Sequence, residues 1–140
     1  MKFIFKIFTF LFLISVPALV FAFEIKDLSE YSSIGIKTLV KSDIAINNNR
    51  LIQSTKNLQD ILGDKPARFV TEYVYAGSKQ SSESGSAAWY AYFPPSYNGR
   101  VKCKLYYDNN TVMHSANTGD ILVIAKKSPD EILLLIVQRG

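Results

Sequence analysis

Three basic side chains, Arg100, Lys102 and Lys104, recur at every second position in the last third of the chain. Residues in a β-strand point alternately to its two faces, so a strand over residues 100–107 places these cations together and turns the apolar residues between them toward a core. At a rise of about 3.3 Å per residue the cations stand about 6 to 7 Å apart. Such a row can bind successive phosphates of a nucleic acid, and an ordinary solvated strand face is the alternative.

Aromatic residues close to this row offer a second kind of contact. Six of them could stack on bases or sugars, and packing of the core and edges of a small β-domain is the favoured alternative; they are Trp89, Tyr90, Tyr92, Tyr97, Tyr106 and Tyr107. Trp89 and Tyr92 could instead line a cleft for a protein or a small molecule. The aromatic residues therefore leave two classes of partner open.

Catalytic and metal chemistry find little support in the chain. Cys103 and His114 are its only cysteine and histidine, so a zinc site lacks ligands and a Cys–His nucleophile has one possible pairing. By its place in the strand pattern, Cys103 is expected to be a small buried residue. The carboxylates are scattered, and Asp108 and Asp120 stand in turn sequences. We expect no catalytic residue, no metal and no cofactor.

The first 22 residues have the pattern of a secretory signal peptide. Lys2 and Lys6 precede a nearly continuous apolar stretch that Pro17 interrupts, and the stretch ends in small residues at Ala22. A short uncleaved membrane anchor is the alternative, since residues 7–23 are at the lower limit for spanning a bilayer. We favour removal after Ala22, which predicts an exported protein with no stable membrane anchor after cleavage.

Residues 23–140 are long enough for one domain with its own core and too short for two. The chain carries a formal net charge of +4, half of which comes from the two lysines before the apolar stretch. The rest is only mildly basic, so a nucleic-acid partner has to be argued from where the charges stand. With one cysteine, no intramolecular disulfide can form.

Short apolar and aromatic runs between turn sequences predict a mostly β protein. A single short helix begins at the cap Ser54 and ends at Gly63, and residues 77–86, rich in Gly and Ser, are expected to form a flexible loop. The prediction is an antiparallel pseudobarrel of six to eight strands with one short helix, whose last two strands form its apolar centre. The expected strands are residues 36–40, 67–76, 87–93, 100–107, 121–125 and 132–137, with a weak one at 111–116.

The order of several segments along the chain matches one known module. They are Leu39-Val40-Lys41-Ser42-Asp43-Ile44, Asn48 to Arg50, Lys104-Leu105-Tyr106-Tyr107 and Gly119-Asp120-Ile121-Leu122. Over residues 36–140 the chain resembles the N-terminal effector-binding domain of EcoRII-type restriction endonucleases, a DNA-binding pseudobarrel. The resemblance implies DNA bound in a concave face of the barrel. It also implies a binding module rather than an enzyme, because the nuclease domain of that family is absent here; a piece of a longer nuclease is the alternative.

The resemblance assigns DNA contacts to the basic strand and to polar residues on loops and at the rim. These residues are Arg100, Lys102 and Lys104, with Asn48, Arg50 and Arg68. The family has a Ser-His-Gln-like run where this chain has Asn48-Asn49-Arg50, and it has a Glu within the basic strand that this chain lacks. These departures favour phosphate contacts over base reading, since Lys binds phosphate as a point charge. Export conflicts with the cytoplasmic site of restriction enzymes, so an exported, non-enzymatic β-barrel that binds a protein or small molecule is the alternative.

Overall fold

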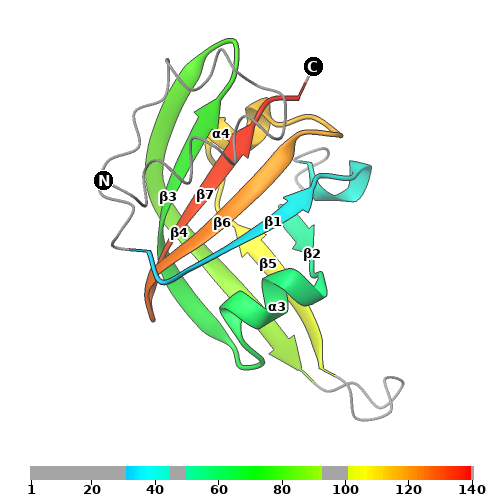
Figure 1. The fold of residues 1–140 in the computed structure, drawn as a ribbon, viewed down its shortest axis with the longest axis vertical. Helices are drawn as coiled ribbons and strands as arrows, with labels where there is room; N and C mark the ends of the chain where they lie inside the picture. Colours follow the sequence, from blue (N-terminus) through cyan, green and yellow to red (C-terminus); the bar gives the residue numbers. More distant parts are fainter. Residues whose placement is uncertain (1–30, 45–49, 93–100, 140) are drawn as a thin grey trace.

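The computed structural model describes residues 31–44, 50–92 and 101–139, and these form one seven-stranded sheet curled into a half-barrel (Figure 1). The strands follow the order β1-β6-β7-β3-β4-β5-β2 across the sheet. Only β3 and β7 pair in parallel; the other neighbours are antiparallel. The predicted mostly β pseudobarrel of six to eight strands is confirmed. The strands are β1 (Ser33–Thr38), β2 (Leu51–Gln53), β3 (Ala67–Ala76), β4 (Gln80–Tyr92), β5 (Lys102–Tyr107), β6 (Ile121–Ser128) and β7 (Glu131–Val137).

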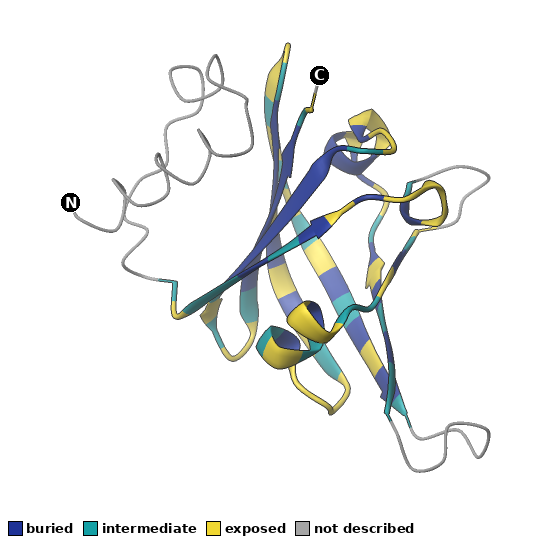
Figure 2. Ribbon diagram, turned by 45° about the vertical axis from the view of Figure 1, so that its right-hand side comes forward, coloured by how far each residue is buried: buried dark blue, intermediate teal, exposed yellow. Residues whose placement is uncertain are grey.

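Strands β6 and β7 are the apolar centre, as the sequence predicted. Residues 121–125 and 132–137 are apolar at every position and all are buried, whereas in β4 buried residues alternate with more exposed ones only from Ala87 onward (Figure 2). A strand buried on both faces needs apolar side chains at each position, which explains the continuous runs. The inner side of the curled sheet holds the main core, whose largest fully buried members include Phe69, Tyr73, Trp89, Leu105, Leu122, Ile124, Leu134 and Ile136.

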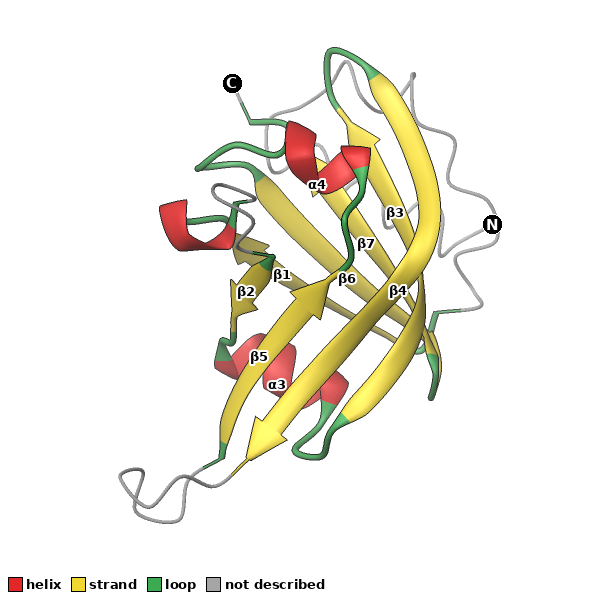
Figure 3. Cartoon of the chain, turned by 180° about the vertical axis from the view of Figure 1, so that it is seen from behind, coloured by secondary structure: helices red, strands yellow, loops and turns green. Residues whose placement is uncertain are grey.

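The predicted short helix is α3 (Lys56–Leu62), with its cap one residue later than expected. The hydroxyl of Thr55, not of Ser54, accepts the backbone N–H of Leu58 at 3.2 Å. Gly63 ends the helix at φ 94°, a conformation that suits glycine. The helix packs its apolar side chains into the core at one end of the half-barrel, and α4 (Thr111–Ser115) lies at the other end (Figure 3).

The predicted flexible loop at residues 77–86 is wrong, because β4 already begins at Gln80. Only residues 77–79 form the turn, and β3 and β4 then pair without a break from Ala76–Gln80 to Ala67–Trp89. Side-chain hydrogen bonds to this half of β4 accompany the ladder: the hydroxyl of Tyr73 donates to the carbonyl of Ser86 at 2.5 Å. Serine-rich composition therefore did not prevent strand formation once a fully matched partner strand was present.

The predicted weak strand at residues 111–116 is also wrong, since this segment contains α4. Asn110 is buried and its side-chain oxygen accepts the N–H of Met113 at 2.8 Å, which caps the helix. Val112 and Met113 reach the core, while His114 is exposed and contacts the side-chain oxygen of Asn109. The Asn-Asn-Thr sequence thus starts a helical turn. None of the helices in the described ranges is long and apolar enough to cross a membrane.

Candidate nucleic-acid interface

Strand β5 places Lys102 and Lys104 on the outward side of the sheet, away from the core. Between them Cys103 is 5% exposed and belongs to the core, and the following Leu105 is fully buried. The alternation expected from the sequence is therefore present over this strand. Arg100, the third cation of the predicted row, lies outside the described residues, as does Asn48.

Three tyrosines from β4 and β5 stand among these lysines. Tyr90 lies directly opposite Lys104 and Tyr92 opposite Lys102, so all four side chains point outward from adjacent strands. The rings of Tyr90 and Tyr92 are 5.2 Å apart edge to face, and those of Tyr90 and Tyr106 are 6.2 Å apart. Tyr90 is 52% exposed and Tyr106 43% exposed. We call this surface, made of Tyr90, Tyr92, Lys102, Lys104 and Tyr106, the tyrosine–lysine face.

Arg68 extends the tyrosine–lysine face across the sheet. It pairs with Ala88 on β4, which in turn pairs with Tyr106 on β5, so the three residues share the outward side. Arg68 is exposed. The structure thus brings Arg68 into line with the predicted basic strand, although 34 positions separate it from Lys102 in the sequence.

Arg50 belongs to a different side of the sheet. Its carbonyl accepts the N–H of Tyr107 at 3.1 Å, and by strand alternation it falls with the core-facing Tyr107 and not with Lys104. The pKa of Tyr107 is raised to about 12, chiefly by burial and also by the charge of Asp43, against an opposing effect of Arg50. Arg50 is exposed at the edge of the sheet, and the structure does not bring it together with the tyrosine–lysine face.

Among the described cations, Arg68, Lys102 and Lys104 point outward and do not line the concave interior of the half-barrel, which core side chains fill. A pocket of about 240 Å³ does adjoin Lys102, between β5 and the start of α3. Its lining is mainly polar and includes a second cation, Lys56. The residues around it are Gln53, Ser54, Thr55, Lys56, Gln59, Val101, Lys102 and Cys103. In place of the concave face expected to hold a polyanion, the described residues form this pocket at one end of an outward-facing surface.

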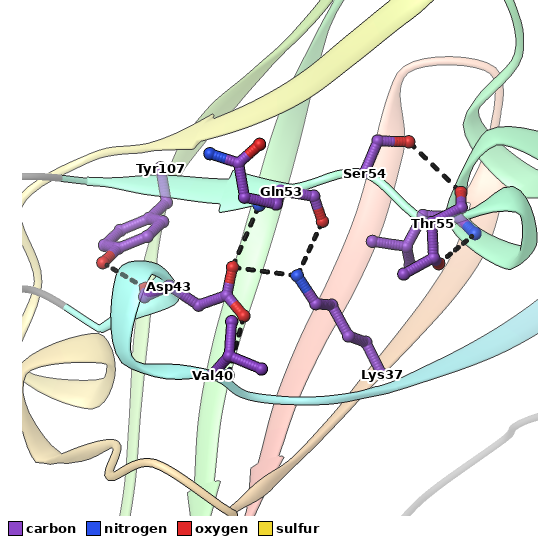
Figure 4. Close-up of polar contacts among 8 residues, drawn as sticks. Lys37, Val40, Asp43, Gln53, Ser54, Thr55 and Tyr107 are labelled. Carbon is purple, nitrogen blue, oxygen red and sulfur yellow. Dashed lines mark hydrogen bonds and ion pairs between the residues drawn. The ribbon is translucent and has the colours of Figure 1, made fainter.

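One polar cluster that the sequence did not predict joins the two edge strands of the sheet (Figure 4). Lys37 on β1 forms a buried ion pair of 2.9 Å with Asp43, which is fully buried in the short helix η2 (Lys41–Asp43). Lys37 also donates to the carbonyl of Gln53 on β2 at 2.7 Å, and Asp43 accepts the N–H of Gln53 at 3.0 Å. Alternation in β1 points Lys37 inward, and this was the one feature of the sequence that could have indicated a buried lysine.

The geometry of this cluster indicates a structural role. The second carboxylate oxygen of Asp43 accepts the N–H of Val40 at 2.9 Å, and the Tyr107 hydroxyl donates to the Asp43 carbonyl at 3.1 Å. A buried charge pair is tolerated when its remaining hydrogen-bonding capacity is filled, as it is here. The cluster closes the half-barrel by linking β1 to β2, and every side-chain oxygen of Asp43 is occupied.

Several other carboxylates also have structural partners. Glu72 accepts from the Ser84 hydroxyl, Glu83 from the backbone of Thr111, and Asp108 from the backbone of Ser86. The described residues contain no group of three or more His, Cys, Asp or Glu side chains that could hold a metal ion. Burial raises the pKa of the Cys103 thiol, and the charge of Asp64 raises it further, which disfavours the reactive thiolate.

The predicted use of Trp89 in a ligand cleft is wrong. Trp89 is 1% exposed and its ring N–H donates to the carbonyl of Gly63 at 2.9 Å, so it anchors the end of α3 within the core. Tyr92, the other residue expected in that cleft, does lie on the tyrosine–lysine face. The sequence could not separate the two because both belong to one aromatic run.

No protein-family model, curated protein or solved structure matches this chain. The class that the fold and the site define is a small mixed β half-barrel with a basic, tyrosine-rich outward face.

Proposed function

We propose that this chain is a DNA-binding module that contacts phosphates through Lys102 and Lys104. One observation carries the proposal: two lysines stand directly opposite two tyrosines on adjacent strands, with a third tyrosine on the same outward face. Lysines supply sequence-independent attraction to phosphate, and exposed tyrosine rings supply contacts to sugars and bases. The resemblance to the EcoRII-type effector-binding domain points to the same class of ligand.

Other residues make secondary contacts in this proposal. Arg68 lies on the same outward side and serves as a rim contact, and Lys56 stands across the pocket from Lys102. Asn48, Arg50 and Arg100 complete the proposed contacts; of these Arg50 reaches the DNA from the edge of β2 and not from the tyrosine–lysine face. Phosphate contact dominates over base reading, because the cations that stand directly opposite Tyr90 and Tyr92 are lysines.

The test is binding of a labelled DNA duplex, followed by fluorescence anisotropy at two ionic strengths. The double variant Lys102→Ala with Lys104→Ala should bind more weakly, and its affinity should depend less on salt. A matched control removes two exposed lysines elsewhere, Lys41 and Lys79. An equal reduction of affinity in both variants would mean that only net charge matters, which would count against a specific role of Lys102 and Lys104. Absence of binding at low salt would overturn the proposal.

The second candidate is an exported β-barrel that binds a protein or small molecule without enzymatic activity. The exposure of Tyr90 and Tyr106 favours it, because tyrosines are common anchors of protein interfaces. This candidate predicts that Tyr90→Ala with Tyr106→Ala abolishes partner binding while the lysine double variant leaves it intact. The tyrosine and the lysine double variants together therefore distinguish the two candidates.

A further inference from the structure

The tyrosine–lysine face belongs to a wide, outwardly convex part of the curled sheet (Figure 3). Strands β4 and β5, which carry it, have β3 on one side and β2 on the other. Neighbouring strands lie about 4.8 Å apart, so the backbones of these four strands span about 14 Å before side chains are added. The major groove of a DNA duplex is about 12 Å wide and admits a two-stranded ribbon. The face is therefore too wide to enter that groove.

A duplex that lies on the surface of this face can use little of it. One convex surface would rest on another, so the contact would be a narrow strip. The bases of a duplex are stacked on each other, and the exposed rings of Tyr90 and Tyr106 would meet only sugars and phosphates. In a duplex complex the tyrosines would therefore contribute little, and the cations would supply most of the attraction.

The rings are arranged to receive unpaired bases. The planes of Tyr90 and Tyr92 are inclined by 69° and those of Tyr90 and Tyr106 by 80°, so neighbouring rings meet edge to face. These two contacts occupy at most two of the six faces of the three rings, and Tyr90 and Tyr106 are 52% and 43% exposed. Sheet modules that bind single strands stack two or three bases on aromatic rings of the sheet face. Three rings on this face can serve the same number of bases.

Cations accompany the rings in each of three register rows that cross the face. Every one of these rows contains a cation and a tyrosine, and none contains a carboxylate. The next carboxylate along the chain, Asp108, lies beyond β5 and accepts the N–H of Ser86 at 2.9 Å. Rings and cations side by side match a strand whose bases and phosphates are both accessible. The rows are Arg68 with Ala88, Tyr106 and Leu51; Tyr90 with Lys104 and Gln53; and Tyr92 with Lys102.

Within the DNA-binding function proposed above, on which this inference rests, we propose that the tyrosine–lysine face selects single-stranded over duplex DNA. The three tyrosines stack unpaired bases, and the cations beside them neutralise the phosphates that join those bases. A flexible single strand can follow the convex face, whereas a duplex is stiff over this length. Duplex DNA binds through the cations alone and therefore binds more weakly.

The test compares one labelled oligonucleotide of about 15 nucleotides, single-stranded and annealed to its complement, by fluorescence anisotropy at one ionic strength. We expect the chain to bind the single strand at least about tenfold more tightly than the duplex. Tyr90→Ala with Tyr106→Ala should weaken single-strand binding at least about tenfold and duplex binding less than about twofold, because the phosphate contacts remain. Val70→Ala, exposed on the same outward side but outside the face, is the matched control and should change neither affinity.

Two further pairs of substitutions separate the aromatic ring from the bulk of the side chain. Tyr90→Phe with Tyr106→Phe keeps both rings and should retain the preference for the single strand. Tyr90→Leu with Tyr106→Leu keeps apolar bulk without a ring and should lose it. Fluorescence of Trp89, which is buried in the core, reports whether each variant is folded. Should the Ala pair alter this fluorescence, the Leu pair takes its place because it keeps more apolar surface.

Three outcomes would overturn the single-strand preference and leave the DNA-binding function intact. The first is duplex binding as tight as single-strand binding. The second is a preference that survives both the Ala and the Leu pair, which would exclude the tyrosines as its source. The third is a loss in the Phe pair as large as in the Ala pair, which would exclude stacking. Absence of binding to either form at low salt would instead overturn the DNA-binding function itself.

Discussion

The outward side of this sheet has two halves of opposite character. Across β1, β6, β7 and β3 it is apolar, and Leu135 in its middle is 2% exposed. Across β4, β5 and β2 it carries lysines and tyrosines, and Tyr90 is 52% exposed. Both halves have the same inner side, a continuous apolar core. The halves therefore share their inner side and differ in the side chains that their outward side carries.

Strand β3 shows where one half changes into the other. Its outward residues near the start are exposed, from Arg68 through Val70 to Glu72, whereas Val74 and Ala76 near its end are buried. The boundary therefore runs along a strand as well as between strands. The outward surface of this half-barrel therefore combines an apolar region with a polar, solvated one.

The largest effect is expected from breaking the link between the two halves. Lys37→Ala leaves Asp43 buried without its charge partner, and removing one partner of such a pair costs about 3 to 5 kcal/mol. Urea unfolding of the wild type and the variant measures this directly. A cost below about 1 kcal/mol would mean that β1 and β2 are held together by other contacts.

A pair of variants tests the contrast between the two halves. Leu135→Ala on the apolar half should lower the free energy of unfolding by about 2 to 5 kcal/mol, as for other buried leucines. Tyr106→Ala on the tyrosine–lysine face, where the ring is 43% exposed, should cost clearly less. Similar costs for both would show that the halves are packed alike, and the distinction would fail.

Removing the two lysines tests whether the tyrosine–lysine face is the half that binds DNA. Lys102→Ala with Lys104→Ala should reduce the slope of log affinity against log salt for duplex DNA by about 2, near one for each phosphate that the variant no longer neutralises. The unfolding free energy should change by no more than about 0.5 kcal/mol for each substitution, since both are surface positions. Titrating salt in the binding assay gives the slope, and an unchanged slope would remove these lysines from the interface.

A modest effect is expected at Tyr107, beside the link between the halves. Its pKa is raised from 10.0 to about 12, chiefly by burial, so the folded chain favours the neutral phenol. This preference contributes stability below pH 10 and is lost as the pH rises toward 12. Tyr107→Phe should cost about 1 kcal/mol at neutral pH because it removes the hydrogen bond to Asp43, and it should flatten the decline between pH 10 and 12. Unfolding curves at pH 8 and pH 11 provide the comparison.

Much of the fold follows from local patterns that act over a few residues. The runs on β3 and β7 and the alternation on β5 predicted strands, and the Gly63 stop predicted the end of α3. Local patterns gave the wrong secondary structure where contacts elsewhere in the fold stabilise the segment. Residues 80–86 look like a flexible loop until β3 pairs with them, and residues 111–115 look like a weak strand until Asn110 caps a helix over the core.

For the candidate site, the sequence alone determined that Lys102 and Lys104 share a face opposite Cys103, because alternation is a property of the strand itself. It could not determine that Tyr90 and Tyr92 stand opposite those lysines, since register depends on how two strands align. Nor could it pair Lys37 with Asp43, which meet only when the sheet curls and its edges approach. Which half of the outward surface is buried and which is exposed was likewise decided by the tertiary structure, because burial depends on neighbours that strand periodicity does not encode.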